Sequence, residues 1–151
     1  MTGEDNVLKL VDAEPSKEYR LQDQIGFLLR RAHQRHVAIF TSNITDLTPP
    51  QFAALVRLRE IGETSQNQLG ALIAMDAATV KGVIDRLNAR GLVEIEKSEA
   101  DKRRLMVRLT QEGRRVVEEL IPCAAATSRE TLSPLSKREA ATLIKLLSKI
   151  V

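Results

Sequence analysis

The spacing of apolar residues changes abruptly near residue 92, and this change limits the folds that the chain can adopt. Before it, apolar residues recur at steps of three and four, as on one face of a helix: Val80, Val83, Ile84 and Leu87. After it, apolar and polar residues alternate, as in half-buried strands: Val93 and Ile95, then Leu105, Val107 and Leu109. The segment between the two alternating runs, SEADKRR at 98–104, is polar. We therefore predict a helix over 76–90, capped by Asp76, followed by a β-hairpin with a charged tip.

Further helices are predicted on both sides of this unit. Ahead of it lie a helix over 17–42, a second helix that begins at Pro49 and stops at Gly62, and a short third helix behind Thr64 and Ser65. Behind it, Thr110 caps a fifth helix, and a capping box opens a last helix over 137–151. We expect this last helix to bury five apolar residues: Ala140, Leu143, Ile144, Leu147 and Val151. The predicted fold is mainly α with a two-stranded hairpin.

Composition excludes several classes of function. A single cysteine excludes an intramolecular disulfide framework and a four-cysteine zinc site, and three Phe, one Tyr and no Trp are too few for a base-stacking platform. No apolar run approaches the roughly 18–20 residues of a membrane span, and the acidic start MTGEDNVLKLVDAEP does not resemble a signal peptide. We therefore expect a cytoplasmic protein with no membrane partner. Phosphate-loop, catalytic-serine and zinc-protease motifs are absent, so we expect no enzyme, no cofactor and no metal site.

Three short helices followed by a charged hairpin is the order of a winged helix-turn-helix, whose second helix enters the DNA major groove. The polar face of the 76–90 helix suits that role, since its small residues admit a close approach and its polar ones can reach bases or phosphates. With the start of the preceding helix and the hairpin tip, the predicted DNA-contacting residues are Ser65, Gln66, Ala77, Ala78, Thr79, Lys81, Gly82, Arg86, Asp101, Lys102, Arg103 and Arg104. Taken alone, the helix could equally be an ordinary amphipathic helix with a solvated face.

The hairpin favours DNA contact. From Lys81 to Arg108, eight basic residues stand against five acidic ones, and three of the eight are consecutive at the tip. Arg103 or Arg104 could enter a minor groove or bind a phosphate, while Asp101 could pair with one arginine and hold the shape of the loop. The alternative is that charged hairpin tips only protect sheet edges and aid solubility.

The stretch TSQNQLGALIAMDAATVKGVIDRLNARGLVEIEKSEADKRRLMVRLTQEGRRVVEEL resembles the core of the MarR family of bacterial transcriptional regulators. It carries the family's D-x-x-T-V helix running into D-R-L-x-x-x-G-L-V, its D-x-R-R wing and its L-T-x-x-G, in that order from about residue 47 to 120. The resemblance implies a homodimer on a pseudo-palindromic double-stranded operator. It places Thr79, Lys81 and Arg86 at groove or phosphate positions and Asp101 with Arg103 on the wing. It also implies dimerisation helices over 17–46 and 111–151 and a winged helix-turn-helix over 47–110. Residues 1–16 carry Pro15 and mixed charge with weak periodicity, and we predict that they form an N-terminal arm.

Members of the family often bind small aromatic or anionic molecules between the dimerisation helices and the DNA-binding lobe. Both histidines and several arginines cluster on the predicted first helix, and the composition of this helix resembles the aromatic-acid-catabolism branch. The candidate effector-binding residues are Arg31, His33, Arg35, His36, Asp46 and Phe52. The alternatives are a solvated face, phosphate contacts, a core histidine, or a metal held by the two histidines. Cys123 departs from the first-helix cysteine of oxidant sensors in this family, and we expect it to be a small buried residue.

Together these features predict a dimeric, sequence-specific regulator of transcription. We expect a repressor released by a small organic effector, an aromatic acid or its coenzyme A thioester. The alternative is a dimeric adaptor that uses the same surface for protein contacts.

Overall fold

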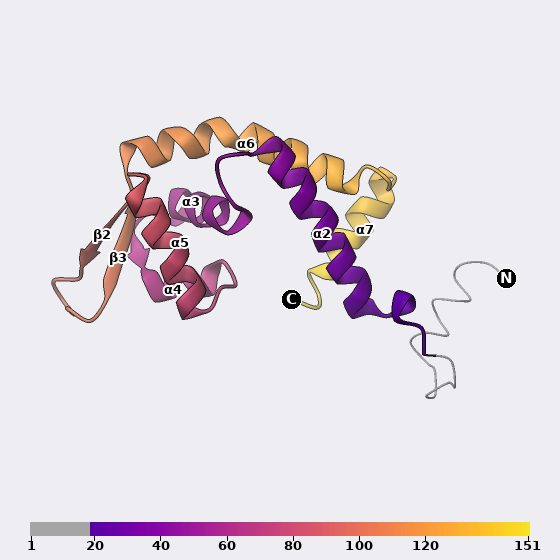
Figure 1. The fold of residues 1–151 in the computed structure, drawn as a ribbon, viewed down its shortest axis with the longest axis horizontal. Coiled ribbons are helices and arrows are strands. Elements are labelled where there is room, and N and C mark those ends of the chain that lie inside the picture. The colour runs from indigo at the N-terminus through magenta and orange to yellow at the C-terminus, as the bar shows by residue number, and fades with distance from the viewer. Residues whose placement is uncertain (1–18) are drawn as a thin grey trace. The chain divides into compact units, whose positions relative to one another are not determined.

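The structure of the chain is a computed structural model that describes residues 19–151, so the predicted arm over 1–16 and the predicted helix start at residue 17 lie outside the described residues. The elements are η1 (Leu21–Asp23), α2 (Ile25–Asn43), α3 (Pro49–Ile61), β1 (Thr64–Ser65), α4 (Gln66–Leu72), α5 (Ala77–Ala89), β2 (Val93–Lys97), β3 (Leu105–Leu109), α6 (Gln111–Leu132) and α7 (Lys137–Leu147), as labelled in Figure 1. They fall into two compact units divided between Ala38 and Ile39, and each is described by itself. The predicted mainly α-helical winged helix-turn-helix is confirmed.

Side-chain caps fix where the helices begin. Thr48 accepts from the Gln51 backbone N–H, and the Gln51 side chain accepts from the Thr48 N–H in return. The Asp76 carboxylate accepts from the Thr79 N–H at 2.7 Å, and this bond lowers the pKa of Asp76 below its ordinary value. The Thr110 hydroxyl accepts from the Gly113 N–H at 3.0 Å. These caps, together with the predicted Ser136–Glu139 capping box, confirm the helix starts expected at 48, 76, 110 and 136.

The sheet has three strands rather than the two that were predicted. Its order is β1-β3-β2, and both pairs are antiparallel. Thr64 pairs with Val107 and Ser65 with Met106, so these two residues, predicted as helix caps and not as strand residues, also form a short third strand. A two-residue strand is too short to show an alternating pattern, so periodicity could not predict it.

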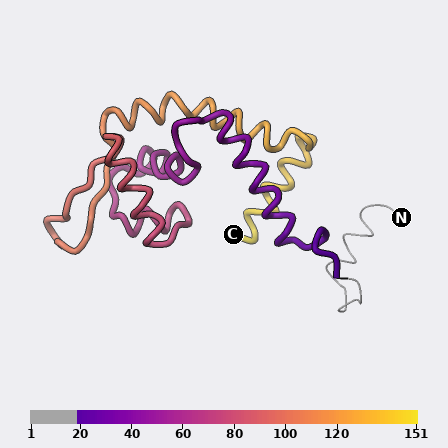
Figure 2. Tube along the Cα trace, in the orientation of Figure 1, coloured from indigo at the N-terminus to yellow at the C-terminus, as the bar shows by residue number. Residues whose placement is uncertain are grey.

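The core of the unit 39–151 joins the helix-turn-helix to the sheet and to α6. Many of its fully buried side chains come from α3, α4, α5, the sheet and α6, among them Leu55, Leu58, Leu69, Val80, Ile84, Leu87, Val93, Val107 and Val117. Figure 2 follows the Cα trace from α5 into the β2–β3 ribbon and directly on into α6. Gly113 lies at this last junction, where an added Cβ would sit 1.9 Å from the Leu92 carbonyl oxygen. The glycine therefore lets α6 start against the sheet.

Two helices differ from their predicted extent and burial. The first α-helix starts at Ile25, because Leu21–Asp23 form a single 3-10 turn and Gln24 is extended. The last helix ends at Leu147, and the expected burial of its apolar face is wrong: Leu143, Ile144 and Val151 are 38%, 54% and 99% exposed. Amphipathic spacing identifies a face that needs to be covered, but it does not show whether the same chain covers it.

None of the helices within residues 19–151 combines the length and the apolar character needed to cross a bilayer.

Candidate nucleic-acid interface

The turn between α4 and α5 positions α5 against the core. A Cβ at Gly70 would lie 3.0 Å from the Val80 side chain, so the two helices approach closely there. Ala74, in the turn, has a positive φ of 57°, and the Met75 N–H donates back to the Gly70 carbonyl oxygen at 2.8 Å. The apolar face of α5 is buried by this packing, and its opposite face is consequently turned outward.

The face of α5 that is not buried carries the predicted residues. Ala77, Ala78 and Thr79 are exposed in the first turn, where the Asp76 cap interacts with both the backbone N–H and the side chain of Thr79. One turn further on, the Lys81 ammonium lies 2.5 Å from the Asp85 carboxylate. Exposed pairs of this kind are weak and can exchange for a phosphate contact. Gly82 and Arg86 continue the same polar face.

The wing tip is a loop closed by its own hydrogen bonds. The Asp101 carboxylate accepts from the Arg103 backbone N–H at 3.0 Å and from Arg103 Nε at 3.3 Å, which confirms the predicted pairing. Ser98 closes the base of the loop, since its N–H donates to the Arg104 carbonyl and its hydroxyl accepts from the Asp101 N–H. The Arg103 side chain is 93% exposed despite its bond to Asp101. Within residues 19–151, Lys102 and Arg104 are exposed and form no ion pair, so their charge remains available.

Not every predicted residue has an outward side chain. Ser65 is 5% exposed, and its hydroxyl accepts from the Gln68 N–H at 3.2 Å as the cap of α4. Gln66 is half-buried, and its side-chain oxygen has no hydrogen-bond partner within the described part of the chain. The structure accounts for Ser65 as a capping residue, so we leave it out of the interface proposed below.

Sequence reasoning missed two contacts of arginines near the predicted interface. Arg108, counted as part of the basic excess, lies among carboxylates on the exposed face of the sheet and donates from Nε to Glu94 at 2.8 Å. This hydrogen bond raises the pKa of Arg108 above its ordinary value. At the end of α5, Arg90 Nη1 donates to the Asp46 carbonyl oxygen and ties the helix to the loop before α3. Residue spacing cannot reveal the Arg90 contact, whereas the strand register could have revealed the Arg108 one.

The candidate effector residues are divided between the two units. In the unit that ends at Ala38, Arg31, His33 and Arg35 are exposed and His36 is half-buried. Asp46 and Phe52 belong to the unit 39–151, where the Phe52 ring packs against the core and lies 5.9 Å from the Phe40 ring. Across residues 19–151, no group of three His, Cys, Asp or Glu side chains has the arrangement of a metal site. Cys123 is half-buried and packs against the core.

Comparison with known proteins identifies a matching family, a similar curated relative and two similar solved structures. The sequence model of the MarR family matches residues 47–105. The HTH-type transcriptional repressor NicR of Pseudomonas putida is 38% identical over 135 residues, which cover 88% of this chain and 85% of NicR. A probable transcriptional regulator from Pseudomonas aeruginosa has 50% identity and a TM-score of 0.83 over 87% of this chain and 100% of its own. BpsR of Bordetella bronchiseptica, whose DNA binding is regulated by 6-hydroxynicotinic acid, has 42% identity and a TM-score of 0.84 over 88% and 96% of the two chains.

Proposed function

Because this chain belongs to the MarR family and is a DNA-binding transcriptional regulator, we propose that it is a homodimeric repressor that leaves its operator when a small aromatic acid binds. The observation that carries the DNA-binding part is the juxtaposition, in one compact unit, of the exposed first turn of α5 and a self-closed basic wing tip. The operator is a pseudo-palindrome in double-stranded DNA, since a two-fold dimer presents two recognition helices to major grooves about 34 Å apart.

The helix α5 and the wing tip contact different parts of the DNA in this proposal. The first turn of α5 enters the major groove, where the Thr79 hydroxyl and the small side chains beside it meet base edges. Lys81 and Arg86, further along the same face, reach the flanking phosphates, with Gln66 at the start of α4 beside them. At the wing, Arg103 is presented by Asp101 while Lys102 and Arg104 add charge along the backbone.

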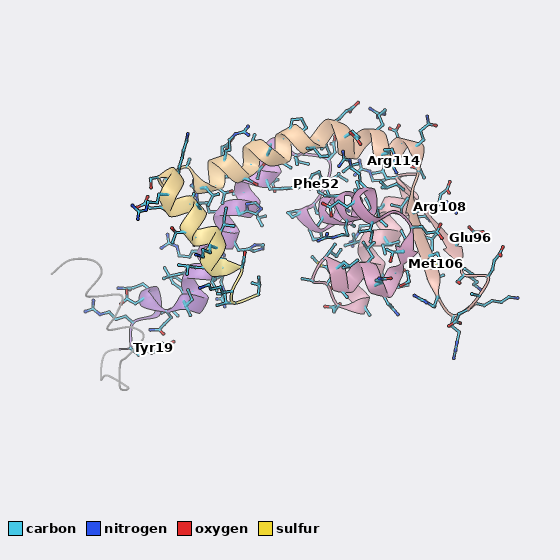
Figure 3. All side chains as sticks on the ribbon, turned by 180° about the vertical axis from the view of Figure 1, so that it is seen from behind. Tyr19, Phe52, Glu96, Met106, Arg108 and Arg114 are labelled. Atoms are coloured by element: carbon cyan, nitrogen blue, oxygen red, sulfur yellow. The ribbon has the colours of Figure 1, made fainter. Side chains whose placement is uncertain are left out.

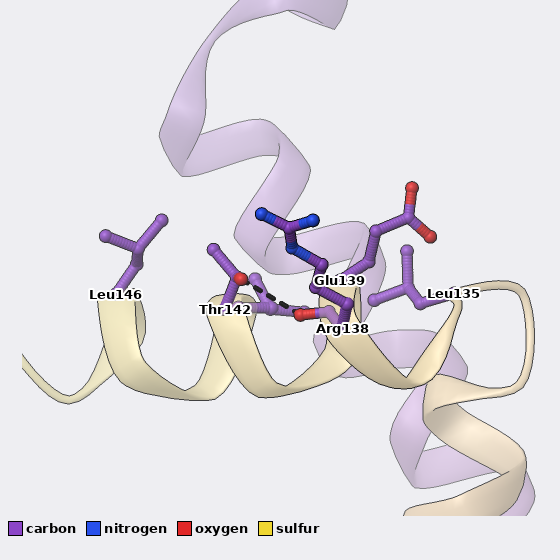
Figure 4. Close-up of a pocket in the computed structure, with 6 residues that line it drawn as sticks. Leu135, Arg138, Glu139, Thr142 and Leu146 are labelled. Carbon is purple, nitrogen blue, oxygen red and sulfur yellow. Dashed lines mark hydrogen bonds between the residues drawn. The ribbon is translucent and has the colours of Figure 1, made fainter.

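The apolar surface of α7 supports the dimer. Leu135, Leu143 and Leu146 line a shallow groove of about 390 Å³, shown in Figure 4, whose polar rim is formed by Arg138, Glu139 and Thr142. The Thr142 hydroxyl donates to the Arg138 carbonyl in this view, which leaves the methyl groups as the main surface of the groove. An apolar helix face of this size is stabilised by burial against a second copy of the chain. We therefore assign 111–151, together with 17–46, to dimerisation, and 47–110 to DNA binding.

The proposed effector is a monocyclic aromatic carboxylic acid. This choice rests on BpsR, and in this chain on the exposed Arg31, His33 and Arg35 on the same helix as the half-buried His36. A guanidinium or imidazolium next to apolar surface suits a carboxylate attached to a ring. Asp46 and Phe52, in the unit 39–151, stay predictions from the sequence alone. Release then follows from linkage, because a ligand that prefers a conformation unable to span two grooves lowers operator affinity by its differential affinity for the two states.

We propose regulation without catalysis or cofactor, since the residues that carry the proposal bind and position rather than react. A repressor works where the chromosome lies, so we place it in the cytoplasm.

The test is fluorescence anisotropy with a duplex promoter fragment over a range of salt concentrations. Wild-type protein should bind, and 6-hydroxynicotinic acid should weaken the binding. Arg103→Ala should weaken binding to all sequences and lower the salt slope by about one phosphate contact per protomer, whereas Thr79→Val should change the preference among sites. Duplex binding with no salt dependence, or equal and uniform losses in both variants, would contradict the assignment.

A further inference from the structure

Arg108 stands at the centre of a charge cluster on the exposed face of the sheet. It lies on the central strand β3, and the register places Glu94 of β2 directly opposite it. On the other side Thr64 pairs with Val107, so the preceding residue, Glu63, faces Arg108 from the β1 edge. Figure 3 shows Arg108 and Glu96 on the sheet face, away from Phe52.

The guanidinium of Arg108 contacts carboxylates from both flanking strands. Its Nε lies 2.8 Å from Glu94, and its Nη1 lies 3.1 Å from Glu96 and 3.5 Å from Glu63. The four side chains are between 45% and 66% exposed, so each pair alone is weak in water. Together, however, three carboxylates share one cation, and the positive charge of this cation offsets the repulsion among the three carboxylates.

We propose that Arg108 is a positioning residue for operator binding, which holds the wing at a fixed geometry to the helix-turn-helix by joining Glu63, Glu94 and Glu96. This inference rests on the proposed function. Glu63 immediately precedes β1, which leads into α4 of the helix-turn-helix, and β2 leads into the wing tip. Both segments are therefore anchored to the same guanidinium.

The surroundings of Arg108 distinguish this role from a phosphate contact. Three carboxylates around one guanidinium leave an excess of two negative charges on this face, which repels DNA. The wing tip, where Lys102, Arg103 and Arg104 gather, is the part of the hairpin that attracts it.

Loss of the guanidinium should act first on β1. This strand has only two residues, and its pairing with β3 is limited to Thr64 with Val107 and Ser65 with Met106. With Arg108 removed, Glu63 and Glu94 lie on opposite sides of β3 with no cation between them, and their repulsion opposes the short pairing of β1 with β3.

The test is a cycle that compares Arg108→Gln in the wild-type background and in a Glu63→Gln/Glu94→Gln/Glu96→Gln background. In the wild-type background we expect operator affinity to fall about threefold to tenfold, with an unchanged salt slope. In the glutamine background the same substitution should cost less than about twofold, because no carboxylates remain for it to join. Equal losses in both backgrounds with a lower salt slope would mean that Arg108 binds phosphate, and no loss in either background would also overturn the proposal.

Arg103→Gln is the matched control, since among the described residues this exposed arginine at the tip forms an ion pair with Asp101 alone. It should lower affinity and salt slope in both backgrounds. Amide hydrogen exchange provides a readout that does not need DNA: Arg108→Gln should speed exchange of β1 and of Met106 and Val107 about threefold to tenfold, in the wild-type background only. Unchanged exchange refutes the proposal even if the wild-type protein binds no operator, whereas absent operator binding alone refutes the proposed function.

Discussion

Replacing Gly82 with alanine separates the stability of α5 from its approach to DNA. Gly82 lies within α5 on the polar face that we propose enters the major groove. In the described part of the chain, the nearest side-chain atom to an added Cβ is Arg86 Nη1, at 3.6 Å, which is an ordinary contact. The protein has room for the methyl group, whereas a groove wall packed against the glycine would not.

The magnitude of the effect follows from these two facts. Alanine is about 0.8–1 kcal/mol more favourable than glycine inside a helix, so the free energy of unfolding should rise by about 1 kcal/mol. For a chain of this size the Tm should rise by roughly 2–4 °C. Operator affinity should nevertheless fall about tenfold, which is about 1.4 kcal/mol and comparable with one mismatched base pair. Urea unfolding followed by circular dichroism measures the first quantity, and anisotropy with an operator duplex measures the second.

Gly113→Ala is the matched control, because it makes the same chemical change at a position without room. Its Cβ would lie 1.9 Å from the Leu92 carbonyl oxygen, so we expect a loss of stability of about 3 kcal/mol or more from the forced shift of α6. A Gly82→Ala protein that is more stable and binds operator as well as wild type would refute the placement of this face of α5 in the groove.

Three further predictions address the dimer, the effector and the pH dependence. Leu146→Glu puts a charge in the α7 groove and should weaken dimerisation at least about 100-fold, measured by sedimentation, while the protomer stays folded. Lys145→Glu, at a neighbouring exposed position, is the control and should leave dimerisation unchanged. An unchanged dimer in Leu146→Glu would place the interface elsewhere. 6-Hydroxynicotinic acid at about 100 times its Kd should raise the Tm by roughly 5–10 °C. His36→Leu should remove this Tm shift without changing operator affinity. A full Tm shift in the variant would exclude His36 from the effector site. The lowered pKa of Asp76 means that its cap stabilises the fold above the ordinary aspartate pKa and that this contribution disappears as the pH falls through the lower, folded-state value. Asp76→Asn keeps a capping oxygen without titrating, so urea midpoints measured from pH 7 down to pH 2 should depend less on pH than in wild type, and identical profiles would contradict this account.

The parts of the fold that could be predicted are those fixed by local chemistry. The caps at Thr48, Asp76, Thr110 and Ser136 each combine a side-chain oxygen with a backbone donor two or three residues away, so short sequence motifs identify them. The buried face of α5 follows from residue spacing alone, because a helix of fixed period that packs on one side has only one apolar face to bury. The family motifs, which run along the chain in order, depend on the same local features.

The parts that could not be predicted depend on partners distant in the sequence or outside the chain. The strand at Thr64 is defined by its pairing with Val107, 43 positions later, and nothing near Thr64 indicates it. The exposed apolar face of α7 has the spacing of a buried helix, since the requirement for burial is the same whether the cover is intramolecular or a second copy. The effector residues are harder still, because Phe52 has the spacing of a core residue and packs against the core.

The charge that the candidate site offers to DNA was the property hardest to predict from the sequence, because it depends on which side chains lie next to each other in space. A count along the chain gives a basic excess between Lys81 and Arg108, but a charge acts on DNA only if its neighbours leave it available. Helical spacing already pairs Lys81 with Asp85 four residues later, and strand register pairs Arg108 with Glu94. The positive charge that remains is concentrated at the wing tip. In the proposed complex we therefore expect the tip to face the DNA backbone and the carboxylate-rich sheet face to turn away from it.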